Sequence, residues 1–368
     1  MIAFFCRTPY HVFRTIQIKM QLYDVESAEV YVFDTFPNAE KIVYRLQQTG
    51  VFENVYFIKD KENFSTGKAA SLKSIFKKSF LNAMLDGKVY EEVFLFNIFA
   101  LSNDVAVNKI KKSNKSCIIN IVEDGPSLYD VHLRDGFTQK ILYPLLGIYT
   151  PSKCIDYWWF SIPERMCPPN GGKKKKIPKV DRNIPHMVDT INCTFDYKDN
   201  KILKNADILF MEECFWSDGL LKDSFDLEIF ECIKNKFSSI RTCVKLHPRT
   251  KVNRFSENFD VIEANGIPWE VYALNMDMSS KIMVSLLCAT MTSTKFLYGE
   301  ETFSLLLYPL FVDKIFDVKT GKRHLTNDLV SQVSNQIELY DDKSKFVVAD
   351  SMDEAYKTID EWLKRLNK

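Results

Sequence analysis

Short apolar runs alternate with amphipathic stretches from the first residues of the chain onward. Runs rich in β-branched and aromatic residues predict strands, and patterns with a helical period separate them. In the first half the predicted strands cover residues 2–6, 28–34, 54–58, 92–97 and 117–122, with helices over 11–22 and near 38–48. Uninterrupted apolar strands between helices are typical of a parallel sheet that is buried on both faces.

The same alternation returns in the second half of the chain. Strands are predicted at residues 206–211, 240–246, 259–262, 281–287, 305–310 and 345–348, and helices near 226–236, 268–275 and 293–298. A strongly amphipathic helix over residues 352–366 follows. Between the halves, residues 162–185 hold five prolines, Gly171-Gly172 and the run Lys173–Lys176, which predicts a loop or linker.

Two successive α/β halves predict an α/β protein of the GT-B type, with two Rossmann-like domains that face a central cleft. We expect the first domain at residues 1–165, a linker at 166–190, the second domain at 191–350, and a C-terminal helix at 351–368 that packs across the domain boundary. Ligands of open parallel sheets bind beyond the carboxyl ends of the strands. The chemistry is therefore expected where strands end.

Composition narrows the function classes. Lys and Arg number 49 and Asp and Glu 48, so the net charge of +1 gives no overall field that would attract nucleic acid. The nine cysteines are odd in number and scattered, which argues against a disulfide framework or a zinc knuckle and fits a reducing cytoplasm. No apolar run reaches the roughly 18–20 residues of a membrane helix. We expect a cytoplasmic protein, for which Lys173–Lys176 leaves open a peripheral contact with the inner face of the cell membrane.

Several motifs of common enzyme classes do not occur in the sequence. No G-x-G-x-x-G follows the first strand, and no P-loop, G-x-S-x-G or H-E-x-x-H sequence occurs. These absences weigh against dehydrogenases, P-loop NTPases, α/β-hydrolases and zinc proteases. No Asp-x-Asp pair occurs either, so a sugar-nucleotide enzyme here would not hold a metal by that device.

The first candidate site follows the strand at 117–122. This strand, which contains Asn120, runs directly into Glu123, Asp124 and Gly125. Successive side chains on a strand point to opposite faces, so one carboxylate is expected to face a ligand while the other braces the loop. Gly125 lets the backbone turn close to a ligand. The alternative is a solvated turn between a strand and a helix.

Two further candidate sites lie in the second half. The strand at 240–246 delivers His247 and Pro248, and Lys245 and Arg249 flank them, which favours an anion site over a plain surface turn. The strand at 281–287 leads into a segment rich in hydroxyl groups that opens a helix. Helix N-termini bind phosphate readily, although Ser and Thr are also the usual helix caps. The hydroxyl-bearing candidates are Thr292, Ser293 and Thr294.

This ordered set resembles bacterial sialyltransferases of glycosyltransferase family 52. That family carries an acidic-acidic-Gly motif, a His-Pro motif and a Ser-Ser/Thr motif, which are matched here by Glu123-Asp124-Gly125, His247-Pro248 and Ser293-Thr294. The opening segment Cys6-Arg7-Thr8-Pro9-Tyr10-His11 is also similar to the first strand and turn of the family. The resemblance spans most of the chain.

The resemblance implies an inverting, metal-independent sialyltransferase without a cofactor. It would move sialic acid from CMP-sialic acid to a galactose-type hydroxyl of a bacterial surface glycan such as capsule or lipooligosaccharide. Asp124 resembles the general base, with Glu123 as the less favoured candidate, and His247 resembles the residue that contacts or protonates the CMP phosphate. Ser293 and Thr294 would hold that phosphate.

The remaining residues are assigned by the same resemblance or by their neighbourhood to the motifs. Glu270 lies where related enzymes recognise the cytidine. The other donor-side candidates are Gly125, Lys245, Pro248, Arg249 and Thr292, and the acceptor-side candidates are Thr8, Pro9, Tyr10, His11 and Asn120.

Some alternatives stay open at the level of sequence. The donor could be another nucleotide sugar, such as CMP-Kdo or a UDP-hexose, or the protein could bind a glycan or nucleotide without catalysis. Glu212 and Glu213, at the end of the first strand of the second half, are less obviously suited to an anionic donor. They either turn away from the site or signal a different donor sugar. A homodimer also stays open.

Overall fold

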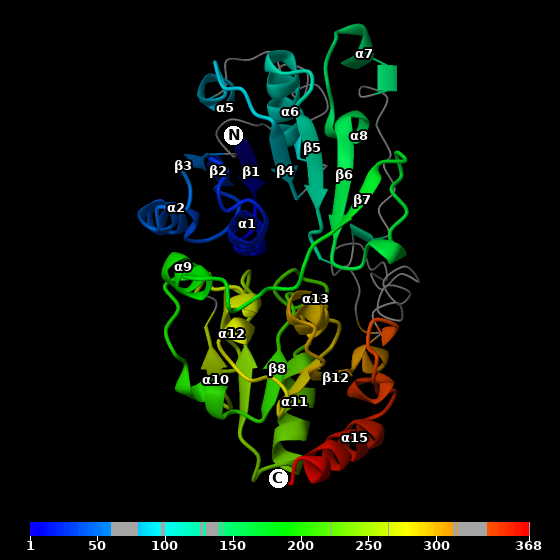
Figure 1. The fold of residues 1–368 in the computed structure, drawn as a ribbon. Coiled ribbons are helices and arrows are strands. Elements are labelled where there is room, and N and C mark those ends of the chain that lie inside the picture. The colour runs from blue at the N-terminus through cyan, green and yellow to red at the C-terminus, as the bar shows by residue number, and fades with distance from the viewer. Residues whose placement is uncertain are drawn as a thin grey trace. The chain divides into compact units, whose positions relative to one another are not determined.

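The structure is a computed structural model that describes residues 1–59, 80–96, 100–125, 128–129, 140–141, 143–221, 223–263, 265–311, 314 and 337–367. The chain forms two compact units, Met1–Tyr197 and Lys198–Lys368. Each unit has its own parallel sheet with helices around it (Figure 1). The boundary lies after the linker expected at 166–190, because that stretch contributes a strand to the first sheet.

The first unit contains a seven-stranded parallel sheet in the order β3-β2-β1-β4-β5-β6-β7. The strand order reverses between β1 and β4, which is the place where doubly wound sheets bind ligands at the carboxyl ends of their strands. The strands are β1 (Ile2–Cys6), β2 (Ala28–Phe33), β3 (Asn54–Ile58), β4 (Glu92–Leu95), β5 (Ile118–Val122), β6 (Ile155–Phe160) and β7 (Lys173–Lys176).

Helices cover this sheet and leave an apolar core that includes Phe5, Tyr31, Ile121 and Trp158. Helix α9 (Met187–Phe195), which the sequence did not predict, packs against α1 and α2. The helical segments are α1 (Pro9–Leu22), α2 (Ala39–Gln48), α5 (Phe80–Met84), α6 (Leu101–Ser113), α7 (Tyr143–Leu145), α8 (Pro151–Cys154), η3 (Pro163–Arg165) and α9 (Met187–Phe195).

The loop predicted over residues 162–185 is wrong for Lys173–Lys176. These four residues form β7, which pairs in parallel with β6 at the edge of the sheet. The ammonium group of Lys175 lies 4.0 Å from the ring centre of Tyr157 and 4.7 Å from that of Trp159, so aromatic faces of β6 stabilise its charge. A lysine-rich edge strand also discourages pairing with another sheet.

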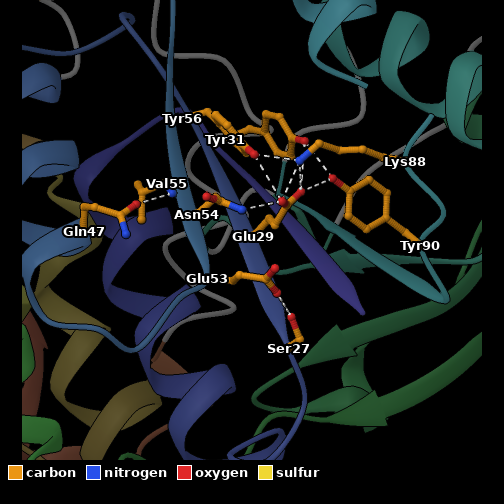
Figure 2. A network of polar contacts seen from close by, with 10 residues as sticks. All are labelled: Ser27, Glu29, Tyr31, Gln47, Glu53, Asn54, Val55, Tyr56, Lys88 and Tyr90. Atoms are coloured by element: carbon orange, nitrogen blue, oxygen red, sulfur yellow. Dashed lines mark hydrogen bonds and ion pairs between the residues drawn. The ribbon is translucent and has the colours of Figure 1, made fainter. Parts of the chain in front are cut away.

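A buried polar network occupies the amino-terminal part of β2. Figure 2 shows Asn54 and the side chains of three tyrosines and a lysine converging on the carboxylate of Glu29. The ammonium group of Lys88 lies 2.5 Å from both carboxylate oxygens, and the hydroxyl group of Tyr90 donates to one of them. Because Glu29 is only 2% exposed, these donors replace the water that its charge has lost. The network lies at the end of the strand opposite to the motif-bearing loops.

The second unit repeats the architecture with a six-stranded parallel sheet in the order β10-β9-β8-β11-β12-β13. Its strand order reverses between β8 and β11. The strands are β8 (Ile208–Met211), β9 (Thr242–Lys245), β10 (Asp260–Ile262), β11 (Ile282–Ser285), β12 (Phe303–Leu306) and β13 (Phe346–Val348). The helical segments are α10 (Lys201–Asn205), α11 (Phe225–Lys236), α12 (Trp269–Leu274), η4 (Ala289–Thr292), α13 (Ser293–Tyr298), η5 (Tyr308–Leu310), η6 (Lys343–Lys345) and α15 (Met352–Arg365).

The C-terminal helix α15 begins at a capping residue, because the hydroxyl group of Ser351 accepts a hydrogen bond from the backbone N–H of Glu354. Its buried residues join the core of the second unit, where the ring of Trp362 stacks on Phe303 at 4.6 Å. We expected the apolar face of this helix to pack across the domain boundary. It packs instead against the core of its own unit.

The prediction of two Rossmann-like α/β units is confirmed. The predicted strands match β1 and β3 to the residue and the other predicted strands within a few residues. All nine cysteines are free thiols. Within the described ranges, no helix has both the length and the apolar character required to cross a membrane.

Candidate functional site

The end of β1 places His11 in the first turn of α1. The hydroxyl group of Thr8 caps this helix by accepting a hydrogen bond from the backbone N–H of His11 at 3.2 Å. Pro9 occupies the first helical position, where its missing N–H and fixed φ angle suit the start of a helix. Thr8 and Pro9 therefore shape the turn that presents His11.

His11 lies beside Asp124. Its Nε2 atom is 2.8 Å from Oδ1 of Asp124, without the alignment of a hydrogen bond. The backbone N–H of Arg7 donates to Nδ1 of His11 at 3.0 Å, so the proton of the neutral imidazole is on Nε2, which faces the carboxylate. The ring stacks on Phe96 with centroids 4.5 Å apart. Phe96 follows β4, the strand between β1 and β5, and so supports the imidazole across the gap.

The two members of this pair differ in exposure. The side chain of His11 is 1% exposed and that of Asp124 is 33% exposed. Asp124 is therefore the group that a substrate hydroxyl can reach, and His11 lies behind it. The next residue, Gly125, has a φ angle of +81°, a conformation that glycine adopts without strain.

Glu123 points the other way and is fully engaged. Its carboxylate forms an ion pair with Arg14 and accepts hydrogen bonds from the backbone N–H of Ser161 and the hydroxyl group of Tyr129, both at 2.8 Å. Glu123 is 2% exposed and Arg14 is completely buried. These contacts argue against Glu123 as the base and make it the carboxylate that braces the loop.

Two acceptor-side candidates also serve the framework. Asn120 is buried, accepts a hydrogen bond from Nε1 of Trp159 at 2.8 Å and donates to Glu92 at 3.1 Å. The hydroxyl group of Tyr10 accepts a hydrogen bond from Nε of Arg14 at 2.9 Å. The structure thus places Asn120 inside the sheet rather than at its carboxyl edge, and the prediction that it faces a substrate is wrong.

In the second unit, the turn after β9 is fixed by Glu212 at the end of β8. One oxygen of its carboxylate accepts hydrogen bonds from the backbone N–H of His247, at 3.0 Å, and from the hydroxyl group of Thr250. Nδ1 of His247 accepts a hydrogen bond from the backbone N–H of Arg249 at 3.2 Å and lies 2.7 Å from Sγ of Cys214. The imidazole is therefore held on its Nδ1 side.

Burial controls the charges at this turn. It lowers the pKa of His247 to about 4, with help from the positive charges of Arg249 and Lys245. Burial also lowers the pKa of Lys245 to about 8, against the favourable charge of Glu270. At neutral pH the imidazole is neutral and most Lys245 side chains are charged. The turn thus combines a buried positive charge on Lys245 with the neutral imidazole of His247.

Glu212 and Glu213 could either turn away from a donor site or signal a different donor sugar. In the structure both carboxylates accept hydrogen bonds from the ends of neighbouring strands. Glu213 accepts hydrogen bonds from the hydroxyl group of Ser285 at 3.0 Å and from the backbone N–H of Leu287 at 2.9 Å. Burial raises its pKa to about 7. The acidic pair joins the end of β8 to the ends of β9 and β11. The sequence signal for this role was an acidic pair directly after an apolar strand.

The hydroxyl motif lies at the start of α13, a helix of six residues. The hydroxyl group of Ser293 donates to the backbone carbonyl of Thr290 at 2.9 Å, and that of Thr294 lies 3.2 Å from the hydroxyl group of Thr302. Thr292 and Thr294 are completely buried. The predicted phosphate contact through the Thr294 hydroxyl is thus not supported, because this group is used inside the core.

The remaining donor-side candidates differ in exposure. Glu270 is in the first turn of α12, 8% exposed, and its backbone carbonyl accepts a hydrogen bond from the hydroxyl group of Tyr298 at 2.7 Å. Pro248 is exposed, and the guanidinium group of Arg249 is 65% exposed and pairs with Asp218 at 3.1 Å. Lys245 is thus electrostatically coupled to Glu270 and to His247, and Arg249 acts on His247 from the surface.

The structure adds residues that the sequence did not single out. Phe96 and the backbone of Arg7 position His11, and Cys214 contacts His247. Within the described part of the chain, no group of three or more His, Cys, Asp or Glu side chains is arranged to hold a metal ion.

No family model matches this chain. No curated protein matches it either. Among solved structures it is similar to UDP-GlcNAc 2-epimerase of Methanocaldococcus jannaschii, with a TM-score of 0.53 and 11% identity over 98% of this chain and 92% of that one. Two further solved structures show weaker likeness. They are the spinosyn forosaminyltransferase SpnP (TM-score 0.47, 12% identity, 100% and 98% coverage) and MurG of Acinetobacter baumannii (TM-score 0.44, 11% identity, 98% and 99% coverage). The two parallel sheets and the likeness to the epimerase together give the chain a fold of the GT-B type.

Proposed function

We propose that this protein is a glycosyltransferase that moves sialic acid from CMP-sialic acid to a galactose-type hydroxyl, with inversion and without a metal ion. The observation that carries the proposal is the Asp124–His11 pair, in which one partly exposed carboxylate at the end of β5 is backed by a buried imidazole. The ordered motifs that resemble glycosyltransferase family 52 supply the donor and acceptor classes. The fold is compatible with this activity and does not by itself require it.

Asp124 acts as the general base in this proposal. The acceptor hydroxyl gives its proton to the carboxylate while its oxygen forms a bond to the anomeric carbon of the sialic acid. The bond from that carbon to the CMP phosphate oxygen breaks, and its electron pair leaves with CMP. A single displacement inverts the anomeric centre. His11 keeps the carboxylate oriented, because its protonated Nε2 faces Oδ1 at 2.8 Å.

The leaving phosphate is assigned to the turn after β9. Lys245 supplies positive charge there, and His247 supplies a hydrogen-bond donor on Nε2, because its Nδ1 atom already accepts the N–H of Arg249. A phosphate monoester carries less charge than a diphosphate, so a cation and a few donors suffice. Glu270 is assigned to the cytidine, as the resemblance implies.

The proposed acceptor is a galactose-terminated bacterial surface glycan, and the proposed place of action is the cytoplasm. The test also includes other nucleotide sugars as donors. The M. jannaschii epimerase was solved with UDP-GlcNAc and UDP, so UDP-GlcNAc belongs in the donor panel beside CMP-Kdo.

The test is an assay of nucleotide release and sugar transfer to lactose, with CMP-sialic acid, CMP-Kdo and UDP-GlcNAc as donors, each with and without EDTA. We expect CMP release from CMP-sialic acid that survives EDTA and is lost in Asp124→Asn. The matched control Glu40→Gln replaces an exposed carboxylate on α2 and should retain full activity. Release from another donor alone would overturn the sialyl assignment. No release from any donor, with no thermal shift on adding CMP or UDP, would overturn the enzyme assignment.

A further inference from the structure

The thiol of Cys214, just after β8, contacts a histidine on the neighbouring turn. Its Sγ atom lies 2.7 Å from Nδ1 of His247, and the backbone N–H of Arg249 donates to the same nitrogen at 3.2 Å. Cys214 is 4% exposed. No described residue bonds Nε2 of His247. The ring is thus held on one side and left open on the other.

The groups that contact Nδ1 of His247 decide which ring nitrogen carries the proton. A backbone N–H can only donate, so Nδ1 of His247 is an acceptor and the proton of the neutral ring is on Nε2. Burial raises the pKa of the Cys214 thiol to about 11, so the sulfur keeps its hydrogen at neutral pH and also serves as a donor. Two donors on one nitrogen favour a single tautomer.

Taken together, the charged groups around His247 also favour its neutral ring. Lys245 and Arg249, on its own strand and turn, oppose a positive ring, and Asp218, in the segment after β8, favours one. Glu212 is also close, but its carboxylate is engaged by the backbone of His247 and by Thr250. Burial and the two cations outweigh Asp218, so the pKa of His247 falls to about 4. The ring is neutral throughout the range in which most enzymes work.

We propose that Cys214 is a positioning residue that fixes His247 in its Nε2–H tautomer, so that His247 meets the leaving phosphate as a neutral hydrogen-bond donor and transfers no proton to it. The identity of the phosphate rests on the proposed function, whereas the tautomer does not. A phosphate monoester has a second pKa of about 6, so CMP leaves near neutral pH without needing a proton from the enzyme.

The tautomer is tested on the free protein by ¹⁵N NMR of the histidine side chains. The chain has five histidines, and the His247 signals are assigned by their loss in His247→Asn. We expect the native spectrum to show an unprotonated Nδ1 and a protonated Nε2 at pH 7. In Cys214→Ala the remaining contact is the longer one to Arg249, so the Nδ1–H tautomer should appear and the pKa of His247 should rise. Cys214→Ser keeps a hydroxyl donor and should restore the native pattern.

Several outcomes would overturn the proposal. One is a native His247 ring that is protonated on Nδ1, or charged at pH 7. Another is a Cys214→Ala variant whose tautomer and titration equal those of the native protein. Cys232→Ala, which removes an exposed cysteine from α11, is the matched control and should leave the His247 signals unchanged. If Cys214→Ala does not fold, the native and Cys214→Ser spectra still decide the tautomer.

Kinetics then test the consequence for catalysis. We expect kcat for CMP release to fall roughly tenfold in Cys214→Ala and to recover in Cys214→Ser, with the KM for the donor changed little. The native pH profile should show no limb that follows His247 above pH 6, whereas the alanine variant should gain one. Absence of any CMP release would refute the proposed function and leave the NMR result standing. A normal rate and profile in Cys214→Ala would refute the positioning role.

Discussion

Nε2 of His11 lies 2.8 Å from Oδ1 of Asp124, although the two residues follow different strands, β1 and β5, with β4 between them. The gap is bridged by Phe96 at the end of β4, on which the imidazole stacks. The fold thus builds a carboxylate–imidazole pair across three strand ends, at the place where the strand order of the sheet reverses. Of the two groups, the carboxylate is the exposed one.

The exposure of Asp124 predicts a selective loss of turnover in Asp124→Asn. The amide has the shape of the carboxylate but accepts no proton, so kcat should fall by roughly 10²–10⁴ while the donor KM stays near its native value. Denaturant unfolding should change little, because the side chain is 33% exposed. Steady-state kinetics with CMP-sialic acid and lactose check this. A variant with native kcat would remove Asp124 from the chemistry.

His11 should act through Asp124 and not on the substrate directly. His11→Asn removes the group that faces the carboxylate, and we expect kcat to fall about tenfold while the KM for the donor stays near its native value. The control is His186→Asn, since His186 is an exposed histidine with a φ angle of +60°, which asparagine tolerates. A native kcat in His11→Asn, or equal losses in both variants, would count against the pair as a functional unit.

The Arg14–Glu123 ion pair should carry stability. Arg14→Met leaves the carboxylate of Glu123 buried without its cation, and such uncompensated charges typically cost about 3–5 kcal/mol. Adding Glu123→Gln removes the charge and should return part of the lost free energy of unfolding. Urea titrations of the single and double variants measure both steps. If the single variant unfolds like the native protein, Glu123 does not depend on Arg14.

The fold was largely predictable because its strands are short apolar runs, and burial on both faces of a parallel sheet demands such runs. Lys173–Lys176 escaped prediction because an edge strand has a solvent side, where lysines are tolerated when aromatic rings of the neighbouring strand lie beneath them. The motifs at the strand ends were also visible, since side chains at those positions face ligands in open sheets.

Side-chain direction was not predictable from the motifs. Thr294 follows a helix start, where its hydroxyl group could have faced a ligand, but Thr302 on a later segment binds it inside the core. Asn120 shows the same limit, because only its pairing with Trp159 and Glu92 on the neighbouring strands shows that it faces the interior of the unit. The contact of Cys214 with His247 joins the ends of two adjacent strands, and a lone cysteine gives no sequence signal for such a partner.

Glu213 predicts a pH dependence of stability. Burial raises its pKa in the folded protein from about 4.5 to about 7, so the folded state favours the protonated acid. A raised folded pKa contributes stability that is fully present below the unfolded pKa and is lost as the pH rises through 7. Glu213→Gln mimics the protonated acid and keeps an oxygen for Ser285 and Leu287. We therefore expect the variant and the native protein to have similar free energies of unfolding at pH 5, and the variant to be more stable by about 1–3 kcal/mol at pH 8.

Denaturant titrations between pH 5 and pH 8 measure this difference. The contribution of His247 to stability must be separated from that of Glu213, because it has the opposite pH dependence. The pKa of His247 is lowered in the folded protein, so its contribution is present above its unfolded pKa and is lost as the pH falls toward 4. Comparing Glu213→Gln with the native protein cancels the His247 contribution, since both carry the same histidine. A difference that stays constant across this range would mean that Glu213 ionises with an ordinary pKa in the folded protein. In that case its carboxylate would bind the ends of β8 and β11 as a charged group, and the two hydrogen bonds from Ser285 and Leu287 would suffice to offset its burial.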